Sequence, residues 1–230
     1  MRRLLVAVLA AALLGPATAT AAPADRVLRA EARALGVPHA QAAVVRDGRV
    51  VWSGATRGTR ADDRLVVASV TKMVVAALAL RLADEGALTL DDPVDRWVDG
   101  VPNGDRITVR MLLAHRSGLR EYFGDAAIRR ALRDATHRWT RAEVVDAIRR
   151  GRPQAEPGGA FAYRNTNYVL LGEVLERAAG VDVETLLQRE LAVPLGLPSL
   201  SFAVGAPGGG RLLGAPLPAD VIGPVWTDGG

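Results

Sequence analysis

The sequence predicts an α+β fold in which one β-hairpin is followed by a mostly helical body. Two β-rich runs flank Asp47-Gly48, which is a strong hairpin signal. Further along, the segment 169–179 carries apolar residues at helical spacing and is closed by Gly180. Because strands and helices fall in separate stretches of the chain, the layout is that of an α+β protein.

The composition is that of a folded protein. The 230 residues are enough for one large domain or two small ones, and 49% hydrophobic residues allow a real core. The formal net charge of +4 is too weak to indicate nucleic-acid binding, because the arginines are scattered among acids. The absence of cysteine excludes disulfides and thiol catalysis, and the three histidines form no metal-binding pair. We expect no metal and no cofactor, and we also expect a monomer.

The N-terminus has the pattern of a secretory signal peptide, which we assign to residues 1–21. A short basic stretch, Met1-Arg2-Arg3, precedes an apolar run from Leu4 to Leu14. Gly15-Pro16 breaks the run, and Ala19-Thr20-Ala21 offers small residues at a cleavage site. The alternative is an uncleaved N-terminal anchor. Either reading predicts that the protein works outside the cytoplasmic membrane, as a secreted or periplasmic protein.

The elements follow in order from the first helix, predicted at Asp25–Leu35 and ending near Gly36. The hairpin strands come next, within residues 42–52, and a helix opened by Ser69 ends near Gly86. Further helices are predicted at 93–97 with Pro93 in its first turn, at 109–114 capped by Thr108, at 125–133, at 141–150 capped by Thr140, at 169–179 and at 182–191. After Pro194, glycine and proline indicate a long loop, with no convincing strand.

The stretch Ser69-Val70-Thr71-Lys72 carries the strongest chemical signal. Lys72 is the only lysine among the 29 lysine and arginine residues. A buried lysine can lose its proton and act as a base, whereas arginine stays protonated. Residues i and i+3 share a helix face, so Lys72 would lie beside Ser69 in the S-x-x-K arrangement of acyl-transfer serine enzymes. The alternative is a serine that caps a helix with a surface lysine in its first turn.

A second candidate constellation is Tyr163-Arg164-Asn165, which follows the Pro157-Gly158-Gly159 turn and precedes a helix. A tyrosine and an asparagine two residues apart can point into one cleft from a tight loop. Tyrosine can relay a proton if nearby cations stabilise its phenolate, and an asparagine amide suits a substrate amide. The alternative is an ordinary loop, and the motif gains weight from its partnership with Ser69 and Lys72.

His115 is a candidate base that we interpret as structural. It lies before Ser117-Gly118 at a predicted helix end, and no G-x-S-x-G elbow surrounds any serine. We expect His115 to hold a loop by hydrogen bonds.

These motifs resemble the first two motifs of the serine β-lactamase and D-alanyl-D-alanine carboxypeptidase superfamily. The most similar branch contains class C β-lactamases and secreted penicillin-binding DD-peptidases. Further stretches agree in order along the chain: Arg46-Asp47-Gly48, Leu90-Asp91-Asp92-Pro93, Leu112 to Leu119, Asn165-Thr166-Asn167-Tyr168 and Pro194-Leu195-Gly196-Leu197.

The resemblance implies a β-lactamase/transpeptidase-like fold, with an antiparallel sheet, an all-helical part and the active site at their junction. It implies that Ser69 is acylated and that Lys72 is its base. It also implies that Tyr163 moves protons to the leaving group and that Asn165 holds the substrate's side-chain amide.

The family's third motif is missing, since no H-x-G or K-[TS]-G sequence occurs. We therefore expect a C-terminally truncated chain, whose hydrolase domain at 22–230 lacks strands of the sheet. The leading hypothesis is a D-alanyl-D-alanine carboxypeptidase that binds peptidoglycan stem peptides or β-lactams. The alternatives are a class C-type β-lactamase, an esterase of the same fold, and an inactive fragment or non-catalytic homologue.

Overall fold

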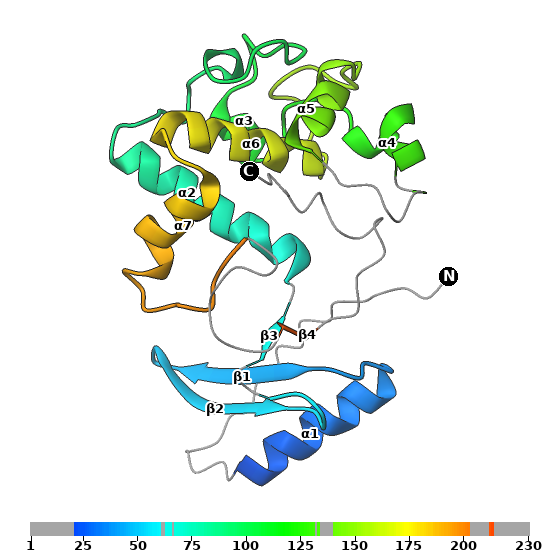
Figure 1. Ribbon diagram of the computed structural model, residues 1–230, viewed down its shortest axis with the longest axis vertical. Coiled ribbons are helices and arrows are strands. Elements are labelled where there is room, and N and C mark those ends of the chain that lie inside the picture. The colour runs from blue at the N-terminus through cyan, green and yellow to red at the C-terminus, as the bar shows by residue number, and fades with distance from the viewer. Residues whose placement is uncertain are drawn as a thin grey trace. The chain divides into compact units, whose positions relative to one another are not determined.

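The computed structural model describes residues 21–60, 63–65, 67–131, 133, 140–202 and 212–213. The chain divides into two compact units, Met1–Asp63 and Arg64–Gly230. The first is built on the hairpin and the second on helices (Figure 1). The predicted signal peptide, apart from Ala21, lies outside the described residues. No described helix is both long and apolar enough to cross a membrane.

The first unit contains α1 (Ala21–Ala34), β1 (Gln41–Arg46) and β2 (Arg49–Ala55). The two strands pair antiparallel, which confirms the predicted hairpin. Asp47 and Gly48 have φ values of 51° and 73°, as a two-residue type I′ turn requires. Helix α1 packs on β2.

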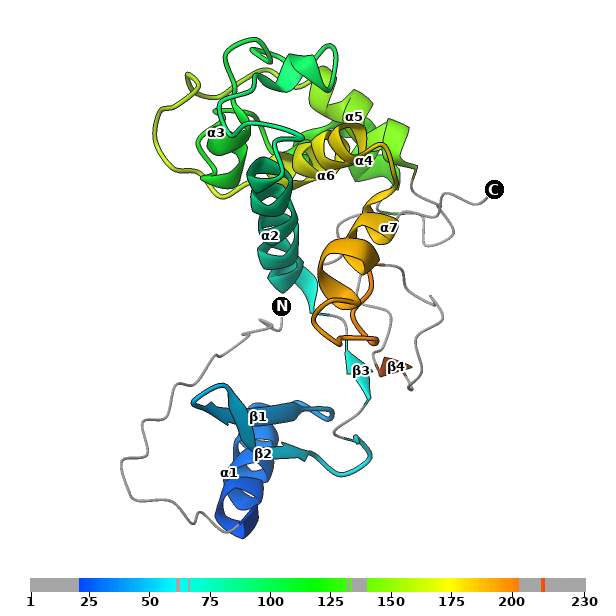
Figure 2. The same ribbon diagram turned by 90° about the vertical axis from the view of Figure 1, so that its left-hand side faces the viewer.

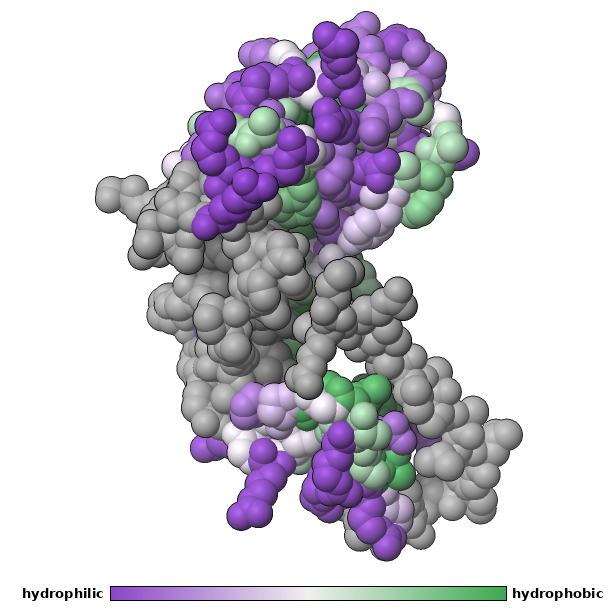
Figure 3. All heavy atoms as spheres, turned by 90° about the vertical axis from the view of Figure 1, so that its right-hand side faces the viewer, coloured by the Kyte–Doolittle hydropathy of each residue, from purple (hydrophilic) through white to green (hydrophobic). Residues whose placement is uncertain are grey.

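Apolar side chains remain on the surface of this small sheet. Val44, Val45, Val50 and Val51 are all exposed, and apolar side chains lie at the surface of the hairpin unit in Figure 3. A two-stranded sheet with one helix buries too little to cover both of its faces.

The second unit is mainly helical. Its α-helices are α2 (Thr71–Asp84), α3 (Val109–Leu113), α4 (Ala126–Ala131), α5 (Arg141–Arg149), α6 (Asn165–Ala179) and α7 (Val183–Leu187). Short 3-10 turns lie at Ala68–Val70, Val94–Arg96 and Tyr122–Gly124, and a π-helical turn at Gln188–Ala192 continues α7. Together with the antiparallel hairpin, these helices confirm the predicted α+β class.

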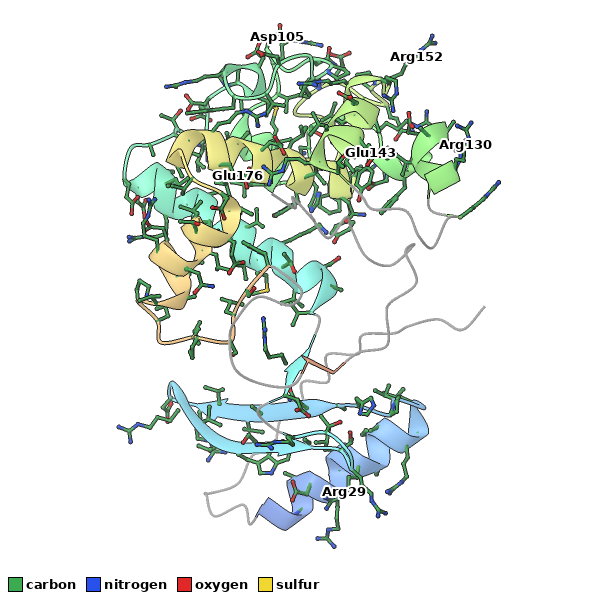
Figure 4. All side chains as sticks on the ribbon, in the orientation of Figure 1. Arg29, Asp105, Arg130, Glu143, Arg152 and Glu176 are labelled. Carbon is green, nitrogen blue, oxygen red and sulfur yellow. The ribbon has the colours of Figure 1, made fainter. Side chains whose placement is uncertain are left out.

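Helix α6 is the centre of the helical unit. It contacts α2, α3, α5 and α7 (Figures 1 and 2). Its inner face is apolar, and the core it forms with α2, α3 and α7 includes the fully buried side chains of Leu78, Leu112, Leu170, Leu171, Leu175 and Leu186. Charged residues such as Asp105, Arg130 and Arg152 extend outward at the periphery (Figure 4). The burial of this apolar face is what fixes the position of α6.

Local capping signals are confirmed in this unit. The Thr140 hydroxyl accepts from the Glu143 amide in a capping box at the start of α5, and Thr108 accepts from Met111 at the start of α3. Gly86, one residue past the C-cap of α2, and Gly180, the C-cap of α6, take positive φ values.

Three element predictions are corrected. The short helix predicted at 93–97 is a 3-10 turn at Val94–Arg96, and Pro93 is its N-cap rather than its first helical residue, with extended φ and ψ and an isolated bridge to Thr108. Helix α6 begins at Asn165, four residues before the apolar run that marked its predicted start. A strand does follow Pro194, since β4 (Leu212–Leu213) pairs in parallel with β3 (Arg64–Leu65).

Candidate active site

Ser69 lies in the middle of the 3-10 turn that leads into α2. The sequence placed Ser69 as the first residue of a buried helix, but the α-helix begins two residues later and Ser69 is exposed. Ala68, directly before it, has a φ of 45°, a left-handed conformation that is strained for a residue with a Cβ. No side chain caps this turn. The hydroxyl is therefore presented to solvent by the backbone of the turn.

Lys72 joins α2 to α6. Its Nζ lies 3.4 Å from Ser69 Oγ and donates a 2.8 Å hydrogen bond to Asn165 Oδ1. The same nitrogen lies 4.9 Å from the centre of the Tyr163 ring and 5.7 Å from that of Tyr168. Both rings stabilise a positive charge through their electron-rich faces. The four residues singled out in the sequence, Ser69, Lys72, Tyr163 and Asn165, are thus brought together around one amine.

Tyr163 is 46% exposed beside this amine. Partial burial raises the pKa of its phenol, but hydrogen bonding with Lys72 and Ser69 and the charge of Lys72 outweigh burial, so the pKa lies below its ordinary value. A phenol that gives up its proton more readily suits proton transfer close to Ser69 Oγ.

The His115 ring packs against the Tyr163 ring. His115 is buried, and its ring stacks on Tyr163 at a centroid distance of 4.6 Å and on Tyr168 at 5.0 Å. Its Nδ1 accepts from the Arg164 backbone amide at 3.2 Å, while its carbonyl accepts from Ala162 at 2.9 Å. Burial, and then the charge of Lys72, lower the pKa of His115. The contacts agree with the predicted structural role, because a neutral imidazole can accept the bond from the Arg164 amide.

The first turn of α6 is bound residue by residue to the segment 115–122. Glu121 Oε2 accepts from the Asn165 amide at 2.6 Å. The Thr166 hydroxyl donates to the Arg120 carbonyl at 2.9 Å and accepts from the Tyr122 amide at 2.9 Å.

Asn167 completes this connection. Its side-chain oxygen accepts from Ser117 Oγ at 2.5 Å, and its Nδ2 lies 3.0 Å from His115 Nδ1. Thr166 and Asn167 are both 0% exposed. The start of α6, and with it Asn165, is therefore fixed by buried polar contacts.

Gly118 allows the backbone at Gln154 and Ala155, in the loop that leads to Tyr163, to approach closely. Its carbonyl accepts from the amides of Gln154 and Ala155, and a Cβ at this position would meet the Ala155 carbonyl oxygen at 2.1 Å. The Arg164 guanidinium donates to Gln154 Oε1 at 3.1 Å and to the Tyr163 carbonyl at 3.3 Å. Only glycine lets the two loops pack this closely.

Sequence reasoning missed the polar residues behind the site, namely Ser117, Glu121, Thr166 and Asn167. Three of them lie in stretches that carried the family resemblance, but no local pattern gives them a partner. Their partners lie 44 to 50 residues away in sequence.

Comparison with known proteins decides the family. The family model described as Beta-lactamase matches residues 24–228. The chain belongs to this family.

Among its relatives, Penicillin-binding protein 4* from Bacillus subtilis (strain 168) is 30% identical over 61% of this chain and 31% of its own. The D-alanyl-D-alanine-carboxypeptidase/endopeptidase AmpH from Escherichia coli (strain K12) is 30% identical over 61% of this chain and 37% of its own. The crystal structure of a D-stereospecific amidohydrolase from Streptomyces sp. matches with 35% identity and a TM-score of 0.68, over 82% of this chain and 60% of that one. The chain spans about a third of the length of these two curated relatives.

Proposed function

We propose that this Beta-lactamase family member is an exported serine hydrolase that forms an acyl-enzyme at Ser69 and acts as a D-alanyl-D-alanine carboxypeptidase on peptidoglycan peptides. The observation that carries the proposal is the Lys72 amine, 3.4 Å from Ser69 Oγ and held 2.8 Å from Asn165. The names of the relatives support the substrate, because one is a D-alanyl-D-alanine carboxypeptidase and another a D-stereospecific amidohydrolase.

Acylation begins with Ser69 Oγ attacking the carbonyl carbon of the penultimate D-alanine. Lys72 Nζ takes the serine proton as the new C–O bond forms. The proton passes through the Tyr163 hydroxyl to the amide nitrogen of the terminal D-alanine. The C–N bond then breaks, D-alanine leaves, and the rest of the peptide stays on Ser69 as an ester.

Deacylation reverses the proton path. A water molecule attacks the ester carbonyl, and Tyr163 with Lys72 takes its proton and returns it to Ser69 Oγ. Asn165 has its Oδ1 occupied by Lys72, so its amide N–H groups are the donors left for the substrate's peptide carbonyl. Asn165 thus orients both the base and the substrate.

Labelling with a fluorescent penicillin, followed by intact mass measurement, tests the proposal. A penicillin carries a strained amide that acylates the same serine, so we expect one adduct on the full chain and none on Ser69→Ala. Hydrolysis of a D-alanyl-D-alanine peptide, followed by release of D-alanine, is the second readout.

The other readings within the family give different results. Fast turnover of a chromogenic cephalosporin would indicate a β-lactamase. Turnover of short-chain esters without penicillin labelling would indicate an esterase. An unlabelled, folded chain that turns over none of these substrates would contradict catalysis altogether.

A further inference from the structure

Glu121 lies directly behind the candidate site and plays no part in the proton path above. It is the residue before the 3-10 turn Tyr122–Gly124, and its Oε2 accepts a 2.6 Å hydrogen bond from the Asn165 amide. Asn165 is the first residue of α6, where backbone amides have no partner within the helix. A carboxylate at that end also interacts favourably with the helix dipole. Glu121 therefore fixes the backbone that carries the Lys72 acceptor.

The Glu121 carboxylate has no cationic partner among the described residues. Within the described parts of the chain, its second oxygen, Oε1, is buried and makes no hydrogen bond, and no lysine or arginine forms an ion pair with it. An uncompensated carboxylate acts over longer range where water is excluded. Burial raises the pKa of neighbouring Tyr122, and the Glu121 charge raises it further.

The negative charge of Glu121 also acts on Tyr163. The groups that face its phenol are Lys72 from α2, Ser69 from the turn before α2, His115 from the loop after α3, Tyr168 from α6, and Glu121. Partial burial raises the pKa of Tyr163, contacts with Lys72 and Ser69 lower it, and the Glu121 carboxylate opposes that lowering. Glu121 is the one carboxylate in this set of groups.

We propose that Glu121 is a positioning residue of the site, which holds the start of α6 in place through the Asn165 amide and adds one negative charge to the groups around Tyr163 and Lys72. This inference rests on the proposed acyl transfer at Ser69. A phenol can donate its proton to the leaving nitrogen, whereas a phenolate has none to give. Glu121 would thus set the pH range over which the leaving group is protonated.

Two substitutions separate the two roles. Glu121→Gln has the same shape and retains an oxygen that accepts from the Asn165 amide, but it removes the charge. Glu121→Ala removes both. Glu184→Gln is the matched control, because Glu184 lies in the first turn of α7 and likewise accepts a backbone amide, from Phe202 at 2.7 Å.

The first experiment follows the ultraviolet absorbance of the phenols against pH in the full chain. The chain has three tyrosines, so a Tyr163→Phe variant assigns the Tyr163 transition. We expect Glu121→Gln to move this transition to lower pH and Glu184→Gln to leave it in place. A folded Glu121→Gln variant with an unmoved Tyr163 transition would overturn the proposal.

The second experiment measures the rate of fluorescent-penicillin labelling across pH. We expect Glu121→Gln to shift the profile to lower pH, and Glu121→Ala to lower the rate about tenfold as well, because the start of α6 loses its anchor. A parent chain that is not labelled, together with a Tyr163 transition that moves to lower pH in Glu121→Gln, would contradict the proposed function and leave the role of Glu121 intact. Normal labelling of the parent chain, with an unchanged pH profile in Glu121→Gln, would support the proposed function and contradict the role of Glu121.

Discussion

The two sides of the candidate site are built differently. On the α6 side, Thr166 and Asn167 are fully buried and hydrogen-bonded to the segment 115–122. On the α2 side, Ser69 is exposed, its turn has no side-chain cap, and Ala68 before it is in a left-handed conformation. The side chains proposed to bind substrate and relay protons lie next to this buried framework, while Ser69, the proposed nucleophile, is exposed. Under the proposed acyl transfer, preorganisation is concentrated where charge must be stabilised.

Lys72→Arg should have the largest effect, because Lys72 connects the two sides. Arginine keeps the positive charge near Asn165 but stays protonated, so it cannot take the proton of Ser69. We expect the rate of penicillin acylation to fall by about 10³-fold or more. Labelling reactions quenched at a series of times measure the acylation rate, and circular dichroism checks the fold. Near-normal acylation in this variant would remove Lys72 from the mechanism.

Gly118→Ala should break the packing on the α6 side. Its φ is 74°, and the added Cβ would meet the Ala155 carbonyl oxygen at 2.1 Å. We expect a loss of about 3 kcal/mol in the free energy of unfolding, measured by urea denaturation. Gly180→Ala is the control, since its φ is also positive, at 68°, but nothing lies within 4 Å; about 1 kcal/mol is expected there. Equal losses would show that the close approach at Gly118 is unimportant.

Thr166→Val tests the polar contacts on the α6 side, because valine has nearly the same shape as threonine. It removes the hydroxyl that contacts the Arg120 carbonyl and the Tyr122 amide, and leaves the buried Tyr122 amide and the partly buried Arg120 carbonyl without this partner. We expect a loss of about 2 kcal/mol in unfolding free energy. Thr185→Val, where an exposed hydroxyl donates to Asp182, should stay within about 0.5 kcal/mol. A harmless Thr166→Val would mean that the start of α6 is held by other contacts.

Ala68→Gly tests the α2 side and should have the smallest effect. Glycine takes a φ of 45° without strain, and the gain slightly exceeds the entropy it adds to the unfolded chain. We expect unfolding free energy to rise by about 0.5 kcal/mol. The same exchange in the last turn of α6, Ala178→Gly, should instead cost about 0.5 kcal/mol. If both variants are destabilised, the turn before Ser69 is not strained.

The sequence was informative wherever the signal is local. The Asp47-Gly48 turn, the Thr140 capping box and the glycines after α2 and α6 each depend on a few neighbouring residues, and all were confirmed. The spacing of Ser69 and Lys72 on one turn is local in the same sense.

The start of α6 shows why the rest was not predictable. Thr166 and Asn167 look like loop residues, because buried polar side chains need partners that the sequence does not reveal. Their partners, such as Tyr122 and Ser117, lie 44 and 50 residues away. Pro93 was placed one residue inside its helix for a related reason, since its bridge partner Thr108 is distant in sequence, directly before α3.

The single lysine makes this site chemically addressable. Among the side chains of the chain, Lys72 carries the sole primary amine. Reductive methylation with ¹³C-labelled formaldehyde would therefore place one side-chain NMR signal at the centre of the candidate site, with the N-terminal amine as the internal reference. That signal would report on the contacts of the amine with Ser69 and Asn165 as ligands arrive, without any engineered probe.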